Sequence, residues 1–132
     1  MREEVKRWLV FANEDLRMAE LALEDGIYNQ TCFHSQQCVE KSLKGALAHH
    51  QSAAPPRTHS MADLLRLLPE EWFKDIRASL LETMDDYYLP TRYPDALPGT
   101  LPEGLPGKTE ADEAIVLARQ TLAAAKQLTG QA

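Results

Sequence analysis

Four polar side chains that could bind an anionic ligand recur at helical spacing between residues 34 and 44. His34, Gln37, Lys41 and Lys44 lie within about 80° of one another on a helix that turns ~100° per residue, roughly opposite an apolar stripe. One imidazole, one amide and two ammonium groups could hold a phosphate or a carboxylate. A solvated helix face is the alternative interpretation, in which Glu40 and Lys44 form an ordinary ion pair one turn apart.

A second polar cluster lies in the segment RTHSMADLL, residues 57–65. His59 precedes a short helix, Ser60 is a natural N-cap, and Asp63 stands where a capping box places its acidic residue. The pattern favours capping over catalysis. A metal site that combines His59 with His49 and His50 is not favoured, because adjacent histidines point apart and no carboxylate or cysteine completes the set. We expect no metal and no cofactor.

The third cluster is the segment YYLPTRYPD, residues 87–95, which contains Tyr88, Arg92, Tyr93 and Asp95. Arginine offers a planar fork for phosphate or carboxylate, and tyrosine offers a ring that can stack on a base. In the structural alternative, Tyr87 and Tyr93 pack on the core and Arg92 pairs with Asp95 or with a carboxylate of a helix.

The elements that must position these clusters all follow the 3.6-residue period of an α-helix. Gly26 marks the end of the first helix, Pro90 the end of the fourth, and Thr109 is a candidate N-cap for the last. The predicted helices cover residues 2–25, 29–50, 60–68, 70–88 and 109–129. No segment alternates with period two. We therefore expect an all-α fold, an antiparallel up-and-down bundle of four long helices plus one short helix.

The composition limits the classes of protein to consider. The 132 residues favour one domain over residues 1–132, with a proline-rich loop at 89–108 before the last helix. A net charge of −6 argues against broad electrostatic capture of nucleic acid. No apolar run is long enough to span a membrane and no signal-peptide core is present, so we expect a cytoplasmic protein. Cys32 and Cys38 are expected to be buried and reduced.

Together these segments resemble one family. CFHSQQCVEKSLKGAL at 32–47, THSMADLL at 58–65 and YYLPTRYPD at 87–95 occur in the order and rough spacing of the HEPN domain (higher eukaryotes and prokaryotes nucleotide-binding). The long first helix, with FANEDLRMAELAL at 11–23, fits as well. The resemblance covers residues from about 5 to 128.

The resemblance implies a helical bundle that commonly forms a homodimer and is often encoded beside a minimal nucleotidyltransferase, as a toxin–antitoxin-like pair. Many members are ribonucleases that use an arginine followed after four to six residues by a histidine. No arginine of this chain has a histidine at that spacing, and Arg57 and His59 are too close. A related Arg–His–Tyr pattern occurs in the family, and partner enzymes modify its tyrosine. This pattern is absent too.

The resemblance therefore implies the non-nuclease branch of the family, a module that binds a nucleotide or phosphate ligand, a minimal nucleotidyltransferase partner, or both. Its matching ligand-binding positions are His34, Gln37, Lys41, Lys44, His59, Asp63, Arg92, Tyr93 and Asp95, and Tyr88 could stack a base. Two other hypotheses remain open. One is a metal-independent ribonuclease built from His34, His59 and Arg92, with RNA as substrate. The other is a purely structural oligomerisation bundle.

Overall fold

The first two helices form an antiparallel hairpin around Gly26. The computed structural model describes residues 2–51, 53–92 and 106–130, with residues 85–92 described by their backbone alone. Helix α1 spans Glu3–Glu24 and helix α2 spans Tyr28–Gln51. Gly26 has a φ of 73°, a left-handed conformation that glycine adopts without strain. The predicted end of the first helix is thereby confirmed.

The connection between α3 and α4 differs from the prediction. Helix α3 spans Met61–Arg66 and α4 spans Arg77–Arg92, so the fourth helix begins seven residues later than predicted. Residues 69–76 form turns instead, and Phe73 has a φ of 60°. The Arg77 guanidinium closes this segment by donating to the carbonyls of Trp72 at 2.9 Å and Leu65 at 3.0 Å.

Both ends of the predicted proline-rich loop are also shifted. The backbone of α4 continues through Pro90 to Arg92, so this proline does not end the helix. Helix α5 spans Lys108–Leu128, and its N-cap is Gly107 rather than Thr109. The Glu110 carboxylate accepts a hydrogen bond from the Gly107 backbone N–H at 2.6 Å, which satisfies a donor at the start of α5. The middle of the loop, 93–105, lies outside the described residues.

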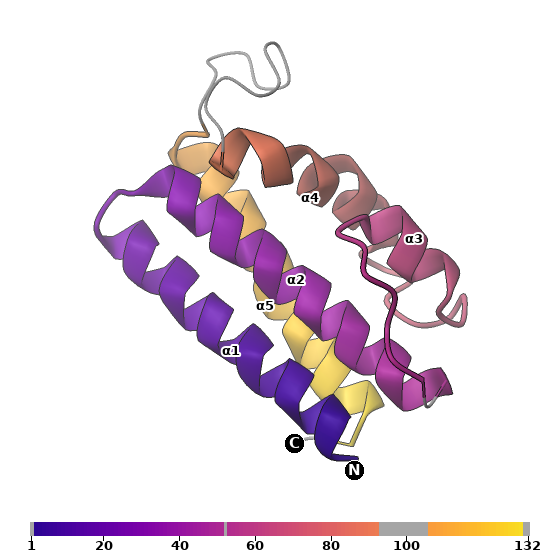
Figure 1. Ribbon diagram of the computed structural model, residues 1–132. Coiled ribbons are helices and arrows are strands. Elements are labelled where there is room, and N and C mark those ends of the chain that lie inside the picture. The colour runs from indigo at the N-terminus through magenta and orange to yellow at the C-terminus, as the bar shows by residue number, and fades with distance from the viewer. Residues whose placement is uncertain (1, 52, 93–105, 131–132) are drawn as a thin grey trace.

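The described residues form an all-α bundle in which consecutive long helices alternate in direction (Figure 1). Helix α2 contacts every other helix, and α5 runs behind it in the same direction. The core contains large aliphatic and sulfur-containing side chains that are fully buried, namely Val39, Leu43, Leu47, Met61, Leu64, Leu80 and Met84. Alanines of α5 at 111, 114, 118 and 125 are also fully buried, and their small side chains let α5 pack closely. The predicted fold class is confirmed.

Helices α1 and α2 approach most closely at Gly45. A Cβ atom at this position would lie 3.1 Å from Leu9 Cδ2 and 3.2 Å from Trp8 Cβ, both on α1. Only a residue without a side chain fits there without displacing its neighbours. This contact places the face of α2 that carries Gly45 directly beside α1.

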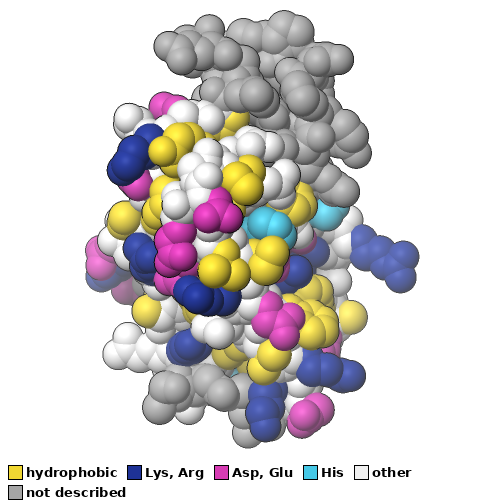
Figure 2. Space-filling view, turned by 90° about the vertical axis from the view of Figure 1, so that its left-hand side faces the viewer, with side chains coloured by type: hydrophobic (Ala, Val, Ile, Leu, Met, Phe, Trp, Pro, Cys, Tyr) yellow, Lys and Arg dark blue, Asp and Glu magenta, His cyan; other side chains and the backbone are white. Residues whose placement is uncertain are grey.

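The outer face of α1 carries apolar side chains between charged ones. Val10, Phe11, Met18 and Leu21 are each 40–49% exposed. Figure 2 shows this side of the molecule, where hydrophobic patches alternate with acidic and basic side chains. In the part of the chain that the structure describes, no helix combines the length and the apolar character that crossing a membrane requires.

Candidate functional site

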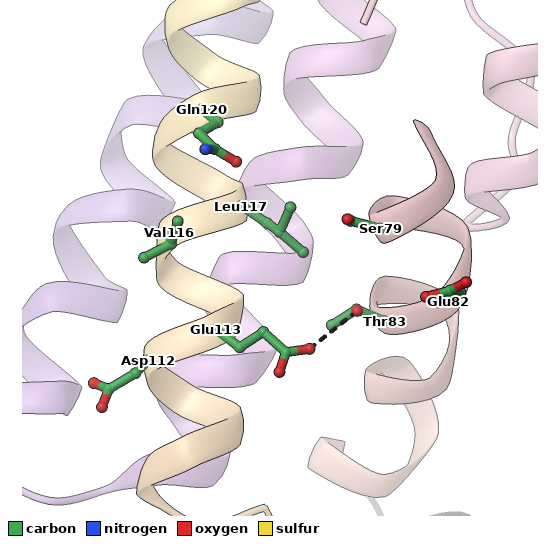
Figure 3. Close-up of a pocket in the computed structure, with 8 residues that line it drawn as sticks. All are labelled: Ser79, Glu82, Thr83, Asp112, Glu113, Val116, Leu117 and Gln120. Carbon is green, nitrogen blue, oxygen red and sulfur yellow. Dashed lines mark hydrogen bonds between the residues drawn. The ribbon is translucent and has the colours of Figure 1, made fainter. Parts of the chain in front are cut away.

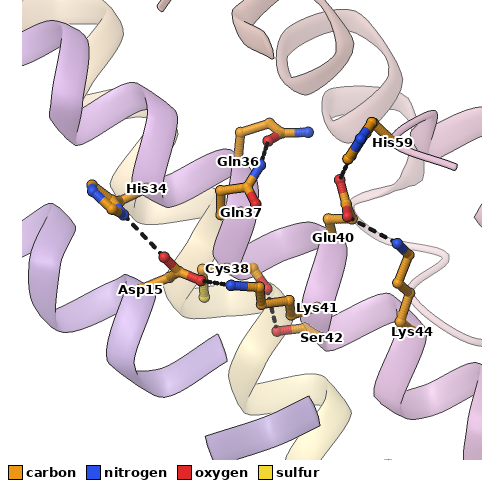
Figure 4. A network of polar contacts seen from close by, with 10 residues as sticks. All are labelled: Asp15, His34, Gln36, Gln37, Cys38, Glu40, Lys41, Ser42, Lys44 and His59. Carbon is orange, nitrogen blue, oxygen red and sulfur yellow. Dashed lines mark hydrogen bonds and ion pairs between the residues drawn. The ribbon is translucent and has the colours of Figure 1, made fainter. Parts of the chain in front are cut away.

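The first part of the candidate site is a carboxylate that joins α1 to α2. Asp15 lies on the inner side of α1 and is 9% exposed. Its Oδ1 accepts a hydrogen bond from His34 Nδ1 at 2.9 Å, and its Oδ2 accepts one from Lys41 Nζ at 2.5 Å (Figure 4). His34 and Lys41 lie two turns apart on one face of α2, so a single carboxylate positions both.

The second part has the same composition and lies further along α2. Glu40 is 4% exposed, and its Oε2 accepts a hydrogen bond from Lys44 Nζ at 3.0 Å. Its Oε1 pairs with Nδ1 of His59, which belongs to the segment before α3, at 2.8 Å. The Lys44 ammonium also lies 5.5 Å from the centre of the Trp8 ring, within range of a cation–π interaction. Glu40 therefore links α2 to the start of α3.

Two neighbouring glutamines of α2 precede Glu40 by about one turn. Gln37 Nε2 donates to Gln36 Oε1 at 2.7 Å. Gln37 is partly exposed, whereas Gln36 is fully buried at the border between the polar face and the apolar stripe. Figure 4 shows that His34, Gln37, Lys41 and Lys44 come from one side of α2, with His59 beside Glu40. We call this set, with Asp15, Gln36 and Glu40, the α2 polar face.

Opposing effects set the protonation of Asp15. Burial raises the pKa of its carboxyl group, but hydrogen bonds from His34 and Lys41, together with their positive charge, outweigh burial. The pKa of Asp15 consequently lies below its ordinary value of 3.8. Two carboxylates balance two ammonium groups on the α2 polar face, so a net positive charge there has to come from the imidazoles.

Asp63 serves the start of α3, as the capping interpretation predicts. Its backbone N–H donates to the Ser60 hydroxyl at 3.2 Å, and its carboxylate accepts from the Thr58 hydroxyl at 3.1 Å. It also pairs with Arg66 one turn later. These contacts make Asp63 part of the helix cap, where it shapes the segment that carries His59.

The third predicted cluster can be placed only in part. Tyr88 and Arg92 belong to the last turns of α4, and their side chains lie outside the described residues. Tyr93 and Asp95 lie outside the described residues altogether. Their assignment as ligand-binding residues stays a prediction.

The two cysteines are buried thiols, as expected. Cys32 and Cys38 are both unpaired and have no exposed surface. Burial raises the pKa of each thiol to about 12. A thiol with so high a pKa carries almost no thiolate at neutral pH, so neither cysteine is an activated nucleophile.

A separate groove of about 490 Å³ lies between α4 and α5. Figure 3 shows its lining, which consists of Ser79, Glu82, Thr83, Asp112, Glu113, Val116, Leu117 and Gln120. The titratable groups of this lining are three carboxylates, which repel a phosphate. Among the described residues, no group of three histidine, cysteine or acidic side chains could hold a metal ion. The α2 polar face therefore remains the candidate for an anionic ligand.

The sequence pattern did not identify Asp15 as part of the site, and it identified only one of the two contacts of Glu40. Asp15 falls beside the buried stripe of α1, next to Leu16 and one turn from Ala12 and Ala19. An acidic residue at such a position needs a partner, and this is the signal that could have identified it. The predicted ion pair of Glu40 with Lys44 is confirmed, but the contact of Glu40 with His59 crosses between segments and has no local sequence signal.

Fold and site together define a class, a small helical bundle whose central helix carries a polar face held by two buried carboxylates. The model of the HEPN domain family matches residues 5–128, and the chain belongs to this family. The resemblance in the sequence is confirmed.

Three known proteins illustrate the relationship. The curated "Putative toxin MJ1304" of Methanocaldococcus jannaschii is 29% identical over 115 residues, which cover 81% of this chain and 74% of that protein. The crystal structure of TT1696 from Thermus thermophilus matches with a TM-score of 0.80 and 35% identity, covering 96% of this chain and 99% of that one. ST0689, described as an archaeal HEPN homologue, matches with a TM-score of 0.67 and 32% identity, covering 99% and 98%.

Proposed function

We propose that this chain is a single-domain HEPN module of a toxin–antitoxin-like pair, and that its α2 polar face binds a nucleotide or another phosphate-bearing ligand. The observation that carries the proposal is the joint fixing of two imidazoles and two ammonium groups by two buried carboxylates. The membership in the HEPN family and the similarity to a protein named as a toxin support the toxin–antitoxin context.

The α2 polar face offers hydrogen-bond donors that are already oriented. The Lys41 ammonium has three N–H groups, its hydrogen bond to Asp15 uses one of them, and its side chain is 26% exposed. Lys44 is only 7% exposed and lies between Glu40 and Trp8, so it acts mainly by holding Glu40. Because the carboxylates cancel the charge of the lysines, we expect the affinity for phosphate to be modest and to rise when the imidazoles are protonated. Arg92, Tyr88 and Tyr93 are proposed to complete the ligand site, by pairing with phosphate and stacking on the base.

Isothermal titration with ATP, GTP and short RNA tests this function. We expect saturable binding of at least one nucleotide, and a loss of affinity of at least about tenfold when His34 and His59 are both replaced by alanine. His50→Ala is the matched control, because it removes an exposed imidazole that packs on Trp72 instead. Absence of saturable heat at millimolar concentration would overturn the nucleotide-binding proposal.

The partners of this module are proposed to be a second copy of the chain and a minimal nucleotidyltransferase. The four large apolar side chains that α1 leaves 40–49% exposed are the surface we propose for such a contact. Light scattering after size exclusion measures the oligomeric state. Co-purification with a nucleotidyltransferase encoded next to this chain tests the pair, and a monomer that binds no such protein would contradict both partners.

A metal-independent ribonuclease is the second candidate, and one observation favours it. His34 and His59 each pair through Nδ1 with a buried carboxylate, which fixes the orientation of the ring as in many general acid–base sites. Cleavage of short RNA that disappears in both His34→Ala and His59→Ala would support this candidate. Cleavage that persists in both variants, or its absence in the native chain, would exclude it.

A further inference from the structure

The buried amide of Gln36 has an unused hydrogen-bond donor. The residue has no exposed surface, and its Oε1 accepts from Gln37 Nε2 at 2.7 Å. Its Nε2 has no hydrogen-bond partner among the residues that the structure describes. Figure 4 shows this nitrogen directed away from Gln37, toward the side of α2 on which His59 lies.

A methionine would fill the same volume without this deficit. An amide nitrogen that is removed from water and left unpaired destabilises the folded state, whereas an apolar side chain of similar shape does not. Buried donors without a partner are rare in folded proteins, and a functional role is one explanation for them. The position of Gln36 also indicates a role in the site. Gln36 lies one turn before Glu40, whose carboxylate holds His59 and Lys44.

We propose that Gln36 is a ligand-binding residue, whose Nε2 donates a hydrogen bond to an acceptor oxygen of the phosphate-bearing ligand. This inference rests on the proposed function of the α2 polar face. The lysines and the Gln36 amide are all able to donate, so the matching ligand is rich in acceptors and poor in donors, as a phosphate ester is. Because Gln36 is inaccessible in the unliganded chain, binding includes rotation of its side chain toward the Glu40–His59 pair.

Gln36→Met separates this role from a purely structural one. We expect the variant to be at least as stable as the native chain, because the unpaired donor is gone and the partly exposed Gln37 amide, which loses its acceptor, can donate to water instead. We expect it to bind ATP at least tenfold more weakly. Ser35→Ala is the matched control, since the Ser35 hydroxyl is the other buried atom without a partner among the described residues. It is expected to stabilise the chain as well while leaving the affinity for ATP unchanged.

The outcomes distinguish the role of Gln36 from the nucleotide binding on which it rests. If the native chain and Gln36→Met bind ATP equally, the role of Gln36 is overturned and the proposed function stands. If the native chain binds neither ATP nor inorganic pyrophosphate, the role of Gln36 and the proposed phosphate-binding function are both overturned. A second measurement covers a variant that fails to fold. The side-chain amide resonances of Gln36 in the native chain should shift when ATP is added to saturation, and unchanged resonances would overturn the inference.

Discussion

Replacing Asp15 by alanine removes the carboxylate that joins α1 to the α2 polar face. Both of its hydrogen bonds, from His34 and from Lys41, disappear, and a charged ammonium group loses its partner. Hydrogen bonds to charged groups contribute about 1.5–3 kcal/mol each, and breaking a buried ion pair costs about 3–5 kcal/mol. The His34 and Lys41 side chains are 21% and 26% exposed, so water replaces part of what is lost.

We therefore expect Asp15→Ala to lower the free energy of unfolding by about 2–3 kcal/mol. For a chain of 132 residues this corresponds to a melting temperature about 6–12 °C lower. Urea titration followed by far-UV circular dichroism measures the free energy. Asp15→Asn keeps one acceptor and should cost roughly half as much.

Glu14→Ala is the matched control for this prediction. Glu14 is the preceding residue on α1, it is exposed, and no ion pair of it is found among the described residues. Its removal should change the stability by less than about 0.5 kcal/mol. A double-mutant cycle with Lys41→Met should show a coupling energy of about 1 kcal/mol or more between Asp15 and Lys41. An Asp15→Ala variant as stable as Glu14→Ala would refute the reasoning.

Three further predictions follow from the same geometry. The folded-state pKa of Asp15 lies below its ordinary value of 3.8, so its contribution to stability is present above about pH 4 and is lost as the pH falls through the folded pKa. The melting temperature of Asp15→Asn should therefore fall less steeply in acid than that of the native chain. Cys32 and Cys38 should react with a thiol-specific dye at about pH 8 only after unfolding in urea, and rapid labelling of the folded chain would contradict their burial. Gly45→Val should cost about 2 kcal/mol or more in urea titration, because its side chain would overlap Leu9, and an unchanged midpoint would show that α1 moves aside freely.

The fold could be predicted from the sequence because each long helix has a clear apolar period. The errors lie where tertiary contacts replace local signals. Nothing in the pattern of residues 70–76 distinguishes a helical turn from the turns that Arg77 holds by donating to carbonyls of the preceding segment. Pro90 lies within α4 although an interior proline removes a backbone donor and usually kinks or breaks a helix. A helix boundary is therefore less predictable than the helix itself.

The candidate site was predictable on one helix only. The spacing of His34 and Lys41 correctly placed them on one face of α2, because helical geometry fixes that relation. The spacing could not show that Asp15 of α1 binds both, since this depends on how closely two helices pack at Gly45. Partners across helices are set by packing, and a single sequence carries little information about them.

The contacts of α3 imply that the bundle does not open as a single unit. Among the described residues α3 packs on α2 and α4 alone, whereas α1, α2 and α5 all contact one another. The free energy needed to expose the amide protons of α3 to exchange with solvent is accordingly smaller than that of global unfolding. Since the bond from Glu40 to His59 ties the start of α3 to α2, a ligand that strengthens this link would slow exchange in α3. The slowest protons of α2 would slow too, because a ligand that binds only the folded chain also opposes global unfolding.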